Sequence, residues 1–280
     1  MKRIKNAVIE GKHQKPIVLD VFYKETQQPK PIIIFCHGYK GFKDWGAWNL
    51  MAKEFVKAGF FFLKFNFSHN GGTVNQPIDF PDLDAFGNNN YTKELDDLET
   101  VMDWVFSNAD FKNEIDVKHL SLIGHSRAGG IVTIKTEEDS RVSKVISLAG
   151  VCDFGKRTAT SGDLEQWKKD GVKYVANGRT KQQMPHFYQF YEDFKQNENR
   201  LNIQRAVSNL VTPYLIIHGD NDTSVFIEEA NKLHFWNPKS QLEIIENADH
   251  VFNTRHPWEK GTLSKELKRA TQICIDFLKK

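Results

Sequence analysis

The sequence has few cysteines and no long apolar run. Its three cysteines, Cys36, Cys152 and Cys274, stand singly along 280 residues. An odd number of isolated cysteines cannot form a closed disulfide framework, and no Cys-x-x-Cys pair indicates zinc or redox chemistry. The longest apolar runs, residues 32–36 and 60–63, are far shorter than the roughly 20 residues that span a bilayer. We therefore expect neither a disulfide scaffold nor a membrane protein.

A surplus of charge of one sign is also missing. Lys and Arg total 38 against 36 Asp and Glu, which gives a formal net charge of +2. A protein that follows phosphates usually carries a basic surplus, so we expect no nucleic-acid partner. Residues 1–10 are charged and lack the apolar segment of a signal peptide, which favours a cytoplasmic protein. The 40% share of hydrophobic residues is too high for a disordered chain.

Strand and helix patterns alternate along most of the chain. Apolar runs predict strands at residues 17–23, 31–36, 60–67, 119–123, 142–148, 213–217 and 241–245. Helical spacing of apolar residues follows at residues 45–58, 91–107, 128–135, 223–236 and 263–278. This alternation is typical of an α/β fold with a mainly parallel sheet and helices on both faces. In such a sheet the reactive loops lie at the carboxyl ends of the strands.

Residues 151–209 interrupt the alternation. The segment is polar and aromatic with few aliphatic runs, and we interpret it as an inserted, mostly helical cap. Residues 1–150 and 210–280 then form a single core. Four rings of the segment recur at helical spacing, namely Phe187, Phe190, Tyr191 and Phe194. The spacing favours packing of the insertion onto the sheet, and contact of one or two rings with a substrate is the alternative.

The most informative stretch is Gly-His-Ser-Arg-Ala at residues 124–128, between a predicted strand and a predicted helix. A serine on such a sharp turn has a strained backbone, so the residues two positions away must be small, as Gly124 and Ala128 are. This pattern resembles the nucleophile elbow Gly-x-Ser-x-Gly of the α/β-hydrolase family, with Ala128 replacing the last glycine. The resemblance implies the α/β-hydrolase fold, with Ser126 as the nucleophile. The helical cap inserted into this fold is our interpretation of residues 151–209, which the resemblance does not cover.

A nucleophilic serine needs a base and an acid that orients the base. In the family the order along the chain is Ser, then Asp or Glu, then His. Asp222 follows the predicted strand at residues 213–217, and His250 follows the next one. Asp220 competes with Asp222 for the orienting role. The resemblance favours Asp222, because the family commonly has His-Gly-x-x-Asp at this place.

A second turn resembles the family's oxyanion hole. His37 and Gly38 directly follow the predicted strand at residues 31–36. The resemblance implies that the backbone N–H groups of Tyr39 and Arg127 bind the oxyanion. We expect His37 to brace this turn by hydrogen bonding. No His-x-x-x-His or carboxylate spacing indicates a metal, and we expect no cofactor.

Together these residues predict a serine hydrolase of the carboxylesterase type. Within the family that the sequence resembles, dehalogenases and epoxide hydrolases use aspartate at the elbow, so Ser126 speaks against both. The polar insertion speaks against the apolar lid of a lipase. We expect the partner to be a small soluble acyl ester or thioester. The alternatives are a serine peptidase of the acylaminoacyl type and a non-catalytic binding protein with the same fold, and the oligomeric state stays open.

Overall fold

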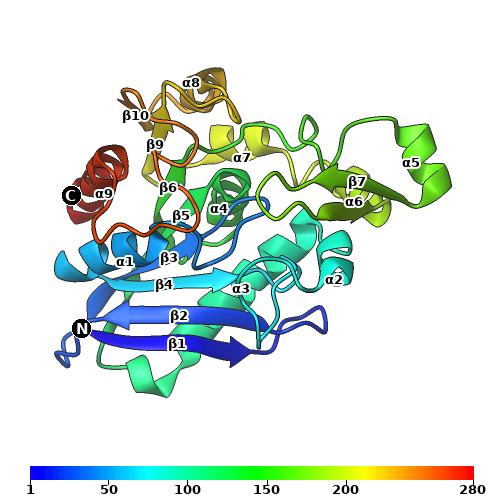
Figure 1. Ribbon diagram of the computed structural model, residues 1–280. Coiled ribbons are helices and arrows are strands. Elements are labelled where there is room, and N and C mark those ends of the chain that lie inside the picture. Colours follow the sequence, from blue (N-terminus) through cyan, green and yellow to red (C-terminus); the bar gives the residue numbers. More distant parts are fainter.

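An eight-stranded sheet runs through the computed structural model, which describes residues 1–280 (Figure 1). Its strands are β1 (Lys2–Ile9), β2 (Ile17–Tyr23), β3 (Lys30–Cys36), β4 (Phe61–Asn66), β5 (Ile115–His125), β6 (Val142–Leu148), β9 (Tyr214–Gly219) and β10 (Gln241–Ile245). Their order across the sheet is β1-β2-β4-β3-β5-β6-β9-β10. The strand β2 runs antiparallel to both of its neighbours, β1 and β4. The other six strands of this order, β4-β3-β5-β6-β9-β10, are parallel to one another.

Helices cover both faces of this sheet (Figure 1). They are α1 (Trp48–Lys57), α2 (Leu83–Gly87), α3 (Tyr91–Ser107), α4 (Arg127–Glu138), α5 (Leu164–Asp170), α6 (Gln189–Gln196), α7 (Ile203–Asn209), α8 (Ile227–Trp236) and α9 (Lys265–Lys279). The helices α1 and α9 pack on one face, and α3, α4 and α8 pack on the other. The predicted arrangement is therefore confirmed. None of these helices combines the length and the apolar character needed to cross a membrane.

The apolar run of β3 explains why its sequence does not alternate. Ile32 and Ile34 belong to the core under α3 and α4, whereas Ile33 and Phe35 belong to the core under α1 and α9. All four side chains have no exposed area. A strand covered on both faces needs apolar residues at every position, which is typical of parallel sheets.

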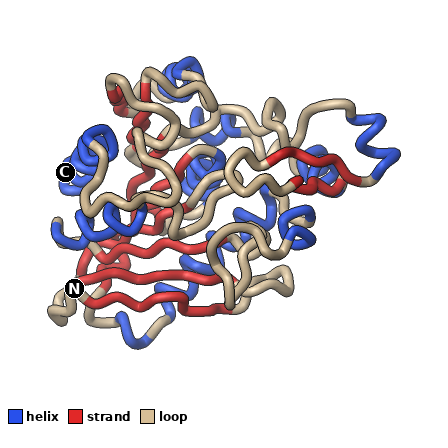
Figure 2. Tube along the Cα trace, in the orientation of Figure 1, coloured by secondary structure: helices blue, strands red, loops and turns tan.

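The insertion at residues 151–209 contains a β-hairpin as well as helices. Its strands β7 (Val172–Ala176) and β8 (Gln183–Phe187) pair antiparallel, apart from the main sheet (Figure 2). This hairpin could not be predicted from the sequence because its strands are short and mixed in polarity, and β8 contains Pro185. Phe190 is buried in the main core, 4.9 Å from the ring of Tyr91. Phe194 is buried in the same core, which confirms the packing of the insertion for these two rings, whereas Phe187 lies in β8 and the predicted helical spacing is wrong there.

Candidate active site

Four loops bring the predicted site residues to one edge of the sheet. They follow β3, β5, β9 and β10, which are parallel strands, so their carboxyl ends lie at the same edge. The loop after β3 begins with His37, and β5 leads directly into Ser126. Asp222 follows β9, and His250 follows β10. Residues that are 124 positions apart in the chain thereby come into hydrogen-bond contact.

Ser126 stands on the predicted strand-to-helix turn. Its backbone has φ 58° and ψ −120°, a conformation that side-chain-bearing residues rarely adopt. The strained turn is held in place because the Ser126 N–H donates to the carbonyl of Leu148 at 2.9 Å. The helix α4 begins at the next residue, Arg127. The first N–H groups of a helix have no partner within it, so this end attracts negative charge.

The backbone packs so closely around the elbow that the neighbouring residues must be small, as predicted for Gly124 and Ala128. A Cβ atom at Gly124 would lie 2.1 Å from the carbonyl oxygen of Ala128. A Cβ atom at Gly129 would lie 2.6 Å from the Ser147 hydroxyl. The first glycine permits the sharp turn, and the second lets α4 pack closely against β6.

A chain of hydrogen bonds joins Ser126, His250 and Asp222. His250 Nε2 lies 2.9 Å from the Ser126 hydroxyl, and His250 Nδ1 lies 2.7 Å from Asp222 Oδ2. The other oxygen of Asp222 accepts the backbone N–H groups of Ser224 and Val225. By contrast, Asp220 accepts the N–H of Asn247 at the surface and does not contact His250. Of the two competing acids, Asp222 is the one that touches the histidine.

Two further histidines, His218 and His125, contact residues of this hydrogen-bond chain. Neither was assigned a role from the sequence. His218 Nε2 donates to the carbonyl of Val225 at 2.7 Å and lies 3.3 Å from Asp222 Oδ2. Burial alone would raise the pKa of Asp222, but hydrogen bonds from His218 and His250 outweigh it and hold this pKa well below its usual range. His125 Nε2 donates to the backbone carbonyl of His250 at 2.8 Å.

The turn after β3 lies against the elbow. A Cβ atom at Gly38 would be 2.8 Å from Ser126 Cβ, so only glycine permits this approach. The N–H of the next residue, Tyr39, donates to no acceptor within the chain. His37 Nδ1 donates to the Gly38 carbonyl at 2.9 Å, and its Nε2 accepts the N–H of Phe67 at 3.4 Å. Burial lowers the pKa of His37 to about 4, so it is neutral and braces the turn, as expected.

The side chains of Tyr39 and Arg127 connect this turn to the rest of the molecule. The Arg127 guanidinium is buried, lies 4.4 Å from the centre of the Tyr39 ring and pairs with Glu94 at 3.2 Å. The Tyr39 hydroxyl lies 3.0 Å from His186 Nε2, which belongs to the hairpin of the insertion. Both side chains are engaged in these contacts, and neither hydrogen-bonds Ser126 or His250.

A cavity of about 180 Å³ opens beside the Ser126 hydroxyl. Its walls are aromatic on one side, with Trp45 and Trp48, and the turn after β3 forms another side. The complete lining is His37, Gly38, Tyr39, Lys40, Gly41, Trp45, Trp48, His125, Ser126, His250 and Val251. No three His, Cys, Asp or Glu side chains are grouped in a way that could hold a metal ion.

Comparisons with known proteins find similarity in structure but not in sequence. No protein-family model matches the chain, and no curated protein does. Est1E from Butyrivibrio proteoclasticus with ferulic acid bound matches at 16% identity and a TM-score of 0.73, over 97% of each chain. The hydrolase GrgF from Penicillium sp. sh18 matches at 16% identity and a TM-score of 0.71, over 100% of this chain and 98% of that one.

An esterase domain from Rhodothermus marinus matches at 18% identity and a TM-score of 0.65, over 99% of this chain and 98% of that one. All three matches cover nearly the whole of both chains, including the insertion. At such low identity they establish the fold. The chain therefore has the α/β-hydrolase fold, as the resemblance in its sequence implied.

Proposed function

We propose that this protein is a serine hydrolase that cleaves a carboxylic ester of a small soluble substrate. The proposal rests on the chain of hydrogen bonds from Asp222 through His250 to Ser126. The Asp222–His250 distance is 2.7 Å and the His250–Ser126 distance is 2.9 Å. A serine that hydrogen-bonds a histidine, itself oriented by an ionised carboxylate, is the arrangement that activates a hydroxyl for acyl transfer. The depressed pKa of Asp222 supports its role as a permanent carboxylate.

The mechanism begins when Ser126 Oγ attacks the acyl carbon and His250 Nε2 takes its proton. The carbonyl oxygen becomes an oxyanion, which the backbone N–H groups of Tyr39 and Arg127 stabilise. His250 then gives the proton to the leaving alcohol, and an acyl-enzyme remains on Ser126. A water molecule loses a proton to His250, attacks this ester and releases the carboxylic acid, while His250 returns the proton to Ser126.

The cavity limits the acyl group. About 180 Å³ between Trp45, Trp48 and Val251 suits a short or planar acyl group rather than a long alkyl chain. Est1E was solved with ferulic acid, a planar aromatic acid, so we include hydroxycinnamoyl esters among the candidate substrates.

We further propose that residues 1–150 and 210–280 act as the catalytic core and residues 151–209 as its cap. Lys40 Nζ donates to the carbonyl of Ala176 in the hairpin, which supports a cap that contacts the turn after β3. We call this turn, which contains Tyr39, the oxyanion turn.

The experiment is a substrate panel with the wild type and the Ser126→Ala variant. It contains nitrophenyl esters from acetate to decanoate, methyl hydroxycinnamates, acyl thioesters and aminoacyl anilides. We expect turnover of short or aromatic esters that falls at least about 10³-fold in the Ser126→Ala variant. Faster turnover of anilides than of esters would make the protein a peptidase. Turnover of no substrate in the panel would favour a binding protein, and ester turnover unchanged in the variant would exclude Ser126 as the nucleophile.

A further inference from the structure

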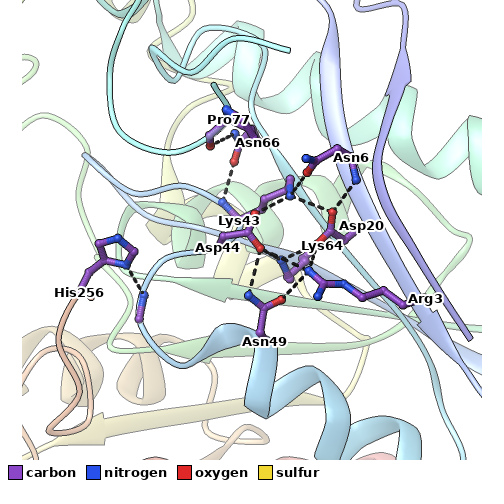
Figure 3. A network of polar contacts seen from close by, with 11 residues as sticks. Arg3, Asn6, Asp20, Lys43, Asp44, Asn49, Lys64, Asn66, Pro77 and His256 are labelled. Atoms are coloured by element: carbon purple, nitrogen blue, oxygen red, sulfur yellow. Dashed lines mark hydrogen bonds and ion pairs between the residues drawn. The ribbon is translucent and has the colours of Figure 1, made fainter. Parts of the chain in front are cut away.

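Four charged side chains lie buried together where the loop after β3 meets the strands β2 and β4 (Figure 3). Asp20 of β2 and Lys64 of β4 are direct cross-strand partners. Lys43 and Asp44 belong to the loop. The side chains of Asp20, Lys43 and Lys64 have no exposed area, and that of Asp44 is 9% exposed. We call these four residues the buried ion cluster.

The buried ion cluster is a ring of charge-assisted hydrogen bonds, and a fifth charged side chain, the partly exposed Arg3 of β1, donates to Asp20 Oδ2 at 2.9 Å. Lys43 Nζ donates to Asp20 Oδ1 at 2.8 Å and to Asp44 Oδ2 at 2.6 Å. Lys64 Nζ donates to the other two oxygens, Asp20 Oδ2 at 3.1 Å and Asp44 Oδ1 at 2.7 Å. Each carboxylate therefore bridges both ammonium groups. The third donor of Lys43 reaches Asn6 Oδ1 of β1 at 2.7 Å (Figure 3).

The loop is also held at Lys43 by its main chain. The Lys43 N–H donates to Asn66 Oδ1 at 2.6 Å, and Asn66 Nδ2 donates to the carbonyl of Pro77 at 2.8 Å. Asn66 is the last residue of β4. The main chain of this loop residue is thus fixed to β4, and its side chain to β2 and β1.

Only three residues separate Lys43 from Tyr39, whose N–H faces no acceptor in the chain. Two hydrogen-bonded turns fill this stretch: the Gly41 N–H donates to the Gly38 carbonyl, and the Trp45 N–H donates to the Phe42 carbonyl, each at 3.0 Å. Because the stretch is short and folded on itself, we expect a displacement at Lys43 to move Tyr39 as well.

We propose that the buried ion cluster positions the oxyanion turn, so that the Tyr39 N–H meets the oxygen of a bound acyl group. This inference rests on the proposed function. Apolar side chains can often replace a buried ion pair without loss of stability, so stability alone gives no reason for four buried charges. Their ring of strong, directional hydrogen bonds fixes two loop residues against two strands. Such precision matters because oxyanion donors act at about 2.7–3.1 Å.

Two variants test the positioning role. Asp44→Asn keeps the shape of the side chain but breaks the ring and leaves an excess of buried positive charge. Asp44→Asn combined with Lys64→Met removes one charge of each sign and restores the balance of the wild type. If the first variant does not fold, the second still carries the test, because a balanced interior is expected to fold.

The matched control is Glu114→Gln. Glu114 forms a buried ion pair with Lys30, and their side chains are 6% and 9% exposed. Lys30 is the first residue of β3, at the end of the strand opposite the oxyanion turn. Removing this pair disturbs stability in a comparable way without touching the site.

For all variants we measure kcat and KM with a nitrophenyl ester, the melting temperature, and the affinity for a trifluoromethyl ketone. Ser126 Oγ adds to this ketone, His250 takes the proton, and the ketone oxygen becomes the oxyanion. We expect both Asp44 variants to lose about 10- to 100-fold in kcat, a part of the about 10² to 10³ that loss of an oxyanion donor costs. KM should stay within about threefold, and ketone affinity should fall by the same factor as kcat/KM.

The melting temperature separates positioning from stability. We expect Glu114→Gln to melt lower with kcat unchanged, and the balanced double variant to regain melting temperature but not kcat. If kcat follows melting temperature in every variant, or if the double variant regains kcat, the positioning role is excluded. If the wild type neither cleaves esters nor binds the ketone, the proposed function fails and this inference fails with it.

Discussion

The imidazole of His125 donates a hydrogen bond to the backbone carbonyl of His250, at 2.8 Å. The residue before Ser126 therefore holds the main chain of the histidine that hydrogen-bonds Ser126. The His125 ring is buried, with its centre 4.9 Å from the His250 ring and 5.3 Å from that of Trp48. Burial lowers the pKa of His125 to about 3, so at neutral pH it is uncharged and does not oppose a proton on His250.

Replacing His125 should therefore slow catalysis without changing substrate binding. His125→Phe keeps an aromatic ring but leaves the His250 carbonyl without its donor, and we expect kcat to fall about 10-fold with KM little changed. The control is His119→Phe in the same strand, because the His119 side chain is 61% exposed. Equal kcat values for His125→Phe and the wild type would show that this hydrogen bond does not position His250.

Two neighbouring aspartates should differ sharply in their effect on turnover. Asp222→Asn removes the charge that holds the His250 tautomer, and we expect kcat to fall about 10⁴-fold, as the same change does in serine proteases with a Ser-His-Asp triad. Asp220→Asn removes an acceptor of the Asn247 N–H at the surface and should change kcat by less than about threefold. Circular dichroism checks that both variants fold. A larger loss for Asp220→Asn would reverse the assignment.

The close approach of the oxyanion turn to the elbow can be tested with one methyl group. In Gly38→Ala the new Cβ would lie 2.8 Å from Ser126 Cβ and 2.9 Å from the His125 carbonyl, so the turn must move away. We expect kcat/KM to fall at least about 10²-fold, comparable to loss of an oxyanion donor. Gly178→Ala is the control, since nothing lies within 4 Å of its Cβ position. Full activity of Gly38→Ala would contradict the role given to this turn.

Asp97 should make stability depend on pH in an unusual direction. Burial raises its pKa to about 7, although one oxygen accepts the Ser68 N–H at 2.8 Å; the other makes no hydrogen bond. The unfolded carboxyl has its ordinary pKa near 3.8. Between these values the folded state binds more protons, so this group adds stability at low pH that is lost as pH rises through about 7.

The variant Asp97→Asn keeps the acceptor for Ser68 and cannot ionise. At pH 8 we expect it to be more stable than the wild type, by up to about 4 kcal/mol, and this gain should vanish near pH 4. Urea unfolding of both proteins at pH 4, 6 and 8 gives the difference directly, because other titrating groups cancel. A difference that is constant with pH would mean that Asp97 ionises normally in the folded protein.

The fold and the hydrogen-bond chain of Ser126, His250 and Asp222 could be predicted from the sequence because their sequence signals are local. Ser126 sits in a short pattern between a strand and a helix, and Asp222 and His250 each follow an apolar run. Parallel strands then bring these residues to one edge. The packing of Ile32 and Ile33 on opposite faces follows from the same apolar run.

The supporting contacts could not be predicted, because they depend on register and on side-chain packing between distant segments. Asp20 and Lys64 are opposite each other only in the register of β2 and β4, 44 residues apart. In the sequence Lys43 and Lys64 are indistinguishable from the many lysines that face water. His125 and His218 stand inside the two patterns, Gly-x-Ser and His-Gly-x-x-Asp, but only the fold shows what their rings touch.

Covalent labelling shows whether Ser126 is an activated nucleophile. A fluorophosphonate is incubated with the wild type, Ser126→Ala and His250→Ala, and intact mass and peptide mapping locate the adduct. We expect one adduct per wild-type chain, on Ser126, with none on Ser126→Ala and labelling of His250→Ala slowed by orders of magnitude. Equal labelling of the wild type and Ser126→Ala, or no labelling of the wild type, would contradict this role of Ser126.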